Sequence, residues 1–113
     1  MTRDFTVSEN NYQRVASTSD IPRGKTLVVT VDNTQVLICH TAEGYFAVDN
    51  LCSHADASLG EGKLKGQRII CPLHGAAFDV RDGSALSKPA KLPLCAHPLK
   101  LEGEDILVAL KTN

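Results

Sequence analysis

Two short motifs that combine cysteine with histidine constrain this chain more than any other feature of its sequence. The first pairs Cys52 with His54 and the second pairs Cys71 with His74, and sixteen residues lie between His54 and Cys71. Each motif supplies one thiolate and one imidazole, and both groups are strong ligands for transition metals. Spacings as short as C-x-H and C-x-x-H suit a tight loop better than a regular strand or helix. Two such loops meeting in space would present two sulfurs and two nitrogens to a metal centre.

The length and composition predict a single domain that spans residues 1–113. A compact unit of this size buries roughly two-thirds of the surface that its unfolded chain exposes. No apolar stretch approaches the roughly 18 residues that a membrane-spanning helix requires. Residues 1–11 lack the apolar segment of a secretory signal, so we expect a cytoplasmic protein without a membrane partner. The formal net charge of -1 argues against a nucleic-acid partner, because phosphate binding depends on an excess of Lys and Arg.

Short β-like runs separated by Gly, Pro, Asn and Asp predict an all-β sandwich or small barrel. Asp32-Asn33 is expected to form a hairpin turn, because both residues tolerate tight-turn backbone angles. From Cys52 onward the periodicity is lost and glycine becomes frequent, as expected for a ligand-bearing excursion between strands. The predicted strands cover residues 12–16, 25–31, 35–40, 45–49, 68–70, 77–79 and 99–110, the last being two strands joined at Gly103-Glu104.

The pattern C-x-H, a spacer in the mid-teens and then C-x-x-H resembles the Rieske iron-sulfur family. Within that family, the short chain without another domain is similar to the free ferredoxins that serve bacterial aromatic-ring dioxygenases. The likeness extends from about Tyr12 onward. Its supporting features are Gly60 and Gly62 after the first motif, Gly75 after the second, a proline-bearing segment at 89–94 with Pro89 and Pro93, and a closing hairpin at 98–108.

The resemblance implies a Rieske fold: an antiparallel β sandwich with a small cluster-binding subdomain at about 50–82. It also implies one 2Fe-2S cluster, with Cys52 and Cys71 on one iron and His54 and His74 on the other. Such a protein carries one electron from an NAD(P)H-dependent flavoprotein reductase to a terminal oxygenase. The sequence shows no acid, base or nucleophile arranged for catalysis, so we expect an electron carrier with no catalytic residues of its own.

The residues around the motifs also predict where the reduction potential lies. High-potential respiratory members of the family have an extra cysteine in each motif, and the corresponding positions here are Ala57 and Leu73. Those members also have a serine and a tyrosine that donate hydrogen bonds to sulfur, where this chain has Ala76 and Phe78. Hydrogen bonds to sulfur stabilise the reduced state, so their absence predicts a potential in the lower part of the Rieske range.

Three alternatives are compatible with these residues. Two cysteines and two histidines also suit a structural zinc site in an interaction module. The common zinc motifs, however, pair cysteine with cysteine and histidine with histidine, whereas both motifs here are mixed. The small Rieske subunit of an assimilatory nitrite reductase has a similar size. A donor to some other oxygenase fits the motifs equally well.

The remaining candidates are expected to have ordinary structural roles. Cys39 and Cys95 are predicted to be reduced packing residues, although a disulfide between them is conceivable. His40 and His97 are predicted to be surface or half-buried histidines without a function. Charged residues near the motifs are predicted to be solvated, with contact to a charged partner as the alternative. They are the cations Lys63, Lys65 and Arg68 and the carboxylates Asp49, Asp56 and Glu61.

Overall fold

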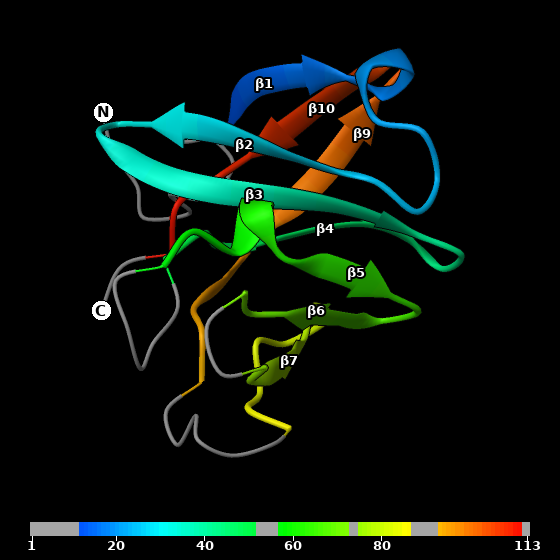
Figure 1. Ribbon diagram of the computed structural model, residues 1–113. Coiled ribbons are helices and arrows are strands. Elements are labelled where there is room, and N and C mark those ends of the chain that lie inside the picture. Colours follow the sequence, from blue (N-terminus) through cyan, green and yellow to red (C-terminus); the bar gives the residue numbers. More distant parts are fainter. Residues whose placement is uncertain (1–11, 52–56, 73–74, 87–92, 112–113) are drawn as a thin grey trace.

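Antiparallel β-sheets make up the fold, as the sequence predicts. Figure 1 shows the computed structural model, which describes residues 12–51, 57–72, 75–86 and 93–111. Within these residues, ten strands form three sheets, and the helical elements are single turns of 3-10 helix. No helix in these residues is long and apolar enough to cross a membrane.

The sheets follow one another through space, with the second in the middle of Figure 1. The first sheet contains, in spatial order, β1 (Gln13–Ser17), β10 (Asp105–Val108) and β9 (Leu99–Glu102). The second contains β2 (Thr26–Val31), β3 (Thr34–Thr41), β4 (Gly44–Asp49) and β8 (Ala96–His97). The third contains β5 (Lys63–Lys65), β6 (Arg68–Ile70) and β7 (Ala77–Asp79). The 3-10 turns are η1 (Thr18–Asp20) and η2 (Leu59–Glu61).

The predicted turn at Asp32-Asn33 joins β2 to β3. Both residues have left-handed backbone angles, with φ of 49° at Asp32 and 67° at Asn33. This conformation gives a two-residue turn the twist that matches a β-hairpin, and Asp and Asn adopt it more readily than most residues. The turn sets the register that pairs Val31 with Thr34.

Strand β3 is buried on both of its faces and therefore belongs to two cores. Val36 and Ile38 pack in the core shared with the first sheet, whereas Leu37 and Cys39 pack in the core shared with the third sheet. Successive side chains of a strand point to opposite faces. This explains why β3 has a continuous apolar run instead of an alternating one.

Most strands lie where the sequence predicts them, but β5 and β8 were missed. The sequence of β5 is Lys-Leu-Lys and that of β8 is Ala-His, so neither is long enough to show a period-2 pattern. The third sheet lies within the segment predicted to bind the cluster. The boundaries of that subdomain, about 50–82, and of the single domain, 1–113, stay predictions.

Candidate metal centre

Of the four predicted ligands, Cys71 belongs to the described residues. Cys52, His54 and His74 lie outside them, as do Leu73, Asp56 and Pro89. The site is therefore built from Cys71 and from the described residues that flank both motifs.

The third sheet presents Cys71 at the end of β6. Ile70 pairs with Ala77 of β7, and the Cys71 N–H donates a hydrogen bond of 2.7 Å to the Ala76 carbonyl. The loop between these strands includes Gly75, whose φ of 72° is one that glycine adopts without strain. Backbone pairing and one glycine thus fix where the second motif leaves the sheet and returns to it.

The thiol of Cys71 is suited to binding a metal in a dry environment. The residue is 2% exposed, its thiol is not in a disulfide, and it packs among apolar side chains. Ala57, which follows the first motif, belongs to the same buried cluster as Cys71 and Ala76. The fold therefore brings the described flanks of the two motifs together. A buried cysteine without a disulfide, packed beside the described flanks of both motifs, fits the cysteine side of a mixed Cys and His ligand set.

The residues beside Cys71 lack hydrogen-bond donors on their side chains. Ala76 and Phe78 are both 0% exposed, and neither carries a polar side-chain atom. Neither Ala76 nor Phe78 can therefore donate a hydrogen bond from its side chain to a sulfur.

The described end of the proline-bearing segment is held close to this sheet. The Leu94 N–H donates a hydrogen bond of 2.7 Å to the Gly83 carbonyl, and Leu94 joins the same buried cluster as Phe78. Gly83 has a φ of 82°, and a Cβ at this position would collide with the Leu94 carbonyl oxygen. Glycine is therefore required where the turn after β7 meets this segment, while Pro93 is exposed.

Sequence reasoning missed a cluster formed by the buried His97 and the half-buried Asp49 and Cys95. The His97 side chain is 3% exposed, and its Nε2 lies 2.8 Å from Asp49 Oδ1. The Lys111 N–H donates a hydrogen bond of 3.0 Å to His97 Nδ1, so His97 donates its Nε2 proton to Asp49. The prediction of a surface or half-buried His97 is therefore wrong, because β8 carries His97 inward against β4. The Asp49 side chain is 36% exposed, so it pairs with His97 while it keeps contact with solvent.

The side chains of this cluster are of the kinds that bind metals, but the nitrogen atoms of His97 are already engaged in hydrogen bonds. One ligand atom from each of Asp49, Cys95 and His97 lies within 4.8 Å of the others. Both ring nitrogens of His97 are engaged, and burial together with Asp49 raises the pKa of the Cys95 thiol, which disfavours the thiolate that binds metals. The cluster therefore acts as a structural tie between β4, β8 and the chain near Lys111.

The remaining predictions for cysteine and histidine hold in part. Cys39 and Cys95 are not joined by a disulfide. Burial raises the pKa of Cys39 to about 12, as expected for a packing residue. His40 donates a hydrogen bond of 2.7 Å from its Nδ1 to the Ile21 carbonyl and stacks on Tyr45 with ring centres 3.9 Å apart.

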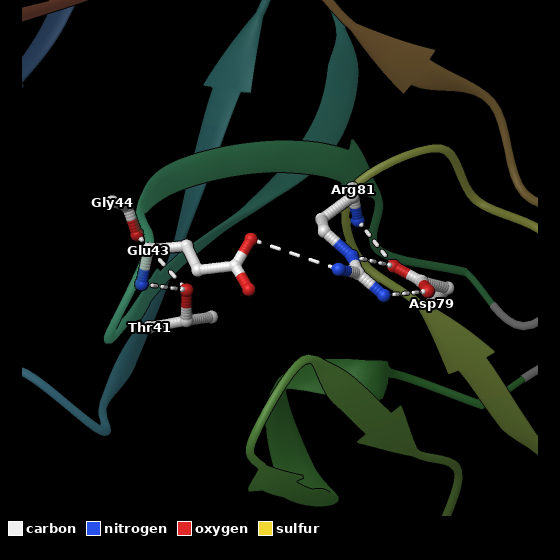
Figure 2. A network of polar contacts seen from close by, with 5 residues as sticks. All are labelled: Thr41, Glu43, Gly44, Asp79 and Arg81. Carbon is white, nitrogen blue, oxygen red and sulfur yellow. Dashed lines mark hydrogen bonds and ion pairs between the residues drawn. The ribbon is translucent and has the colours of Figure 1, made fainter.

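A polar network links β7 to the turn between β3 and β4 (Figure 2). Arg81 forms an ion pair of 2.8 Å with Asp79 and a longer one of 3.6 Å with Glu43. The hydrogen bond from Arg81 holds the pKa of Asp79 below its usual value, and the same interaction raises the pKa of Arg81. The cations Lys63, Lys65 and Arg68 are exposed on the third sheet and form no ion pair among the described residues, which agrees with a solvated surface.

Comparison with known proteins gives one family and a consistent group of relatives. The model of the Rieske [2Fe-2S] domain family matches residues 11–106. The ferredoxin component of biphenyl 2,3-dioxygenase from Rhodococcus jostii is 39% identical over 98 residues, covering 87% of this chain and 92% of the relative.

Solved structures agree with this result. The ferredoxin of carbazole 1,9a-dioxygenase from Nocardioides aromaticivorans superposes with a TM-score of 0.86 at 36% identity, covering 89% of this chain and 99% of that one. A chain from a complex of reduced oxygenase and oxidized ferredoxin in carbazole 1,9a-dioxygenase superposes with a TM-score of 0.83 at 31% identity, covering 88% and 93%. A Mycobacterium tuberculosis chain assigned to the small subunit of an NADH-dependent nitrite reductase has a TM-score of 0.79 at 21% identity, covering 90% and 96%, and this likeness shows the fold alone.

Proposed function

Because the chain belongs to the Rieske [2Fe-2S] domain family, we propose that it is the ferredoxin component of an aromatic-ring dioxygenase system. In this role it takes one electron from an NAD(P)H-dependent flavoprotein reductase and passes it to the terminal oxygenase. The similarity to the Rhodococcus ferredoxin over nearly the whole of both chains carries this proposal. The solved complex of a related ferredoxin with its oxygenase supports the choice of partner.

The cofactor is one Rieske-type 2Fe-2S cluster, which supplies a site that accepts and releases a single electron. We assign Cys52, His54, Cys71 and His74 as its ligands, with the cysteines on one iron and the histidines on the other. The burial of Cys71 in the cluster that includes Ala57 and Ala76 supports this assignment. The apolar residues around Cys71 leave it 2% exposed, so the cysteine side of the site would be shielded from water.

The buried Ala76 and Phe78 support a potential in the lower part of the Rieske range, which spans roughly -150 to +300 mV. A low potential suits an electron received from a flavoprotein and delivered to an oxygenase. A voltammetric midpoint above about +150 mV would contradict this part of the proposal.

The test is reconstitution from purified components. Protein produced with adequate iron should contain iron and sulfide in equal amounts and show the Rieske-type EPR signal after reduction. It should then support NADH-dependent product formation by a biphenyl or naphthalene dioxygenase oxygenase component together with a ferredoxin reductase. Zinc or no metal in fresh protein would overturn the cluster assignment, and support of a nitrite reductase instead of any dioxygenase would overturn the choice of partner.

A further inference from the structure

Asn50 is a buried polar residue at the entrance to the first motif. It follows β4, precedes Cys52 by two positions, and is 1% exposed. A buried side-chain amide needs partners for its two donor hydrogens and its acceptor oxygen.

Hydrogen bonds satisfy Asn50 on both its backbone and its side chain. Its N–H donates to the Gln35 carbonyl at 3.1 Å, and its carbonyl accepts from the Leu59 N–H at 2.7 Å. Its Nδ2 donates to Gln35 Oε1 at 3.0 Å and to Ser58 Oγ at 2.9 Å. Its Oδ1 accepts from the Gly60 N–H at 2.9 Å. Both amide hydrogens are thus used, and each of its partners is on another part of the chain.

These partners lie on both sides of the first motif. Leu51 and Ser58 form an isolated antiparallel bridge, so the described residues on either side of the first motif meet at this pair. Asn50 lies on the outgoing limb, while Ser58, Leu59 and Gly60 lie on the returning limb. The bonds to Gln35 attach Asn50 to β3 in the middle sheet, and the returning limb is joined to β3 through its bonds to Asn50.

We propose that Asn50 is a positioning residue that fixes the two ends of the segment carrying Cys52 and His54 to β3. This inference rests on the proposed function, because it treats that segment as a ligand loop. A ligand loop whose ends separate more easily releases its metal more easily and holds it in a wider range of geometries. Asn50 thereby controls how long the cluster is retained and how uniform its surroundings are.

The chemistry of the amide explains why other residues are poor substitutes. Aspartate keeps the acceptor for Gly60 but loses both donor hydrogens and places a charge in a buried site. Alanine removes all three side-chain bonds and leaves the Gly60 N–H and Gln35 Oε1 without their partner. Serine cannot span the distances to Gln35, Ser58 and Gly60 together.

The experiment compares Asn50→Ala with a matched loss of buried hydrogen bonds elsewhere. Thr41 is 3% exposed, and its hydroxyl accepts a hydrogen bond from the Glu43 N–H and donates one to the Gly44 carbonyl at the β3–β4 turn (Figure 2). It ends β3, whereas Gln35, the partner of Asn50, lies near the start of that strand. Thr41→Val removes these bonds without changing the shape of the side chain. Both variants are prepared in the cluster-loaded form, and loss of visible absorption in the presence of an iron chelator gives the rate of cluster release.

Asn50→Ala is expected to release the cluster roughly tenfold faster than wild type or more, while Thr41→Val stays within about twofold. The EPR lines of Asn50→Ala are expected to broaden and its midpoint potential to shift, whereas Thr41→Val keeps the wild-type spectrum and potential. Equal release rates for the two variants, together with an unchanged spectrum in Asn50→Ala, would overturn the inference.

Ser58→Ala decides the matter if Asn50→Ala does not fold, because it removes only one of the three side-chain bonds. It is expected to release the cluster a few times faster than wild type. A wild-type rate in Ser58→Ala would then overturn the inference alone. Wild-type protein that lacks iron and sulfide would overturn the proposed function, and this inference with it.

Discussion

The flanks of the two motifs are held in place by different kinds of interaction. The ends of the first segment meet at Asn50, whose side-chain amide joins them through two bonds, to Ser58 and Gly60, and makes a third bond to Gln35 of β3. The second motif leaves and re-enters a hairpin whose strands pair through their backbones, closed by the bond from Cys71 to Ala76. The side chains of Ile69 and Phe78, one from each strand of that hairpin, are buried in an apolar core.

This difference predicts different sensitivity to substitution. Backbone bonds persist with almost any side chain, so the second motif depends mainly on the volume of the apolar residues below it. The first segment depends on one residue type, since few side chains donate two hydrogen bonds and accept a third within one buried site. The following predictions test this contrast.

The largest loss is expected from Phe78→Ala, which removes the main apolar support of the second motif. Phe78 is 0% exposed, and truncating a buried phenylalanine costs about 3–5 kcal/mol. The measurement is chemical denaturation of the cluster-loaded protein without oxygen. Arg68→Ala, an exposed position on the same sheet, is the control and should stay within about 0.5 kcal/mol of wild type. Similar losses in the two variants would show that apolar burial does not support this sheet.

His97→Ala tests the tie beside the first segment. The change leaves the Lys111 N–H and the Asp49 carboxylate without their buried partner, at a cost of about 1–3 kcal/mol. His97→Gln keeps an amide that can replace one of the two bonds, so its denaturation midpoint should fall between those of wild type and His97→Ala. If His97→Ala were as stable as wild type, β8 would not need this side chain for attachment to β4.

A smaller loss is expected from Ser58→Ala, in which Asn50 Nδ2 loses one partner. One hydrogen bond contributes about 0.5–1.5 kcal/mol net. The same series of denaturation measurements can resolve it. A loss equal to that in Phe78→Ala would mean that the first segment is held by far fewer bonds than the structure shows.

The smallest effect is expected from the pair formed by half-buried Asp79 and exposed Arg81. Arg81 lowers the pKa of Asp79 in the folded protein below its usual 3.8, so the stability that this carboxylate contributes is present above pH 3.8 and is lost as the pH falls below that value. Asp79→Asn should therefore be slightly less stable than wild type near neutral pH, and the two should converge in acid. Denaturation midpoints across this range are the test, and high salt should reduce the difference at neutral pH. If the difference in denaturation midpoint between wild type and Asp79→Asn became larger in acid, the predicted direction of the pH dependence would be wrong.

The sequence predicted what depends on local pattern and on a recognised motif. Alternating runs and the Asp32-Asn33 turn located most of the strands, and Cys71 lies in a hairpin between the two strands expected to present it. Contacts between distant residues could not be predicted in this way. Asp49 and His97 are 48 positions apart and meet only because a two-residue strand pairs with β4. Asn50 has no distinguishing local pattern, since its role depends on Gln35 and Ser58 arriving from elsewhere.

The double burial of β3 has a consequence for anyone who wishes to transplant the electron-carrying part of this protein onto another scaffold. Leu37 and Cys39 pack in the apolar core that the third sheet covers, while their neighbours Val36 and Ile38 pack in the core on the opposite face of β3. An excised piece that began after β4 would lack these two side chains and expose Ile69 and Phe78 to water. A minimal graft must therefore include the β3–β4 hairpin and offer a new apolar surface for its opposite side.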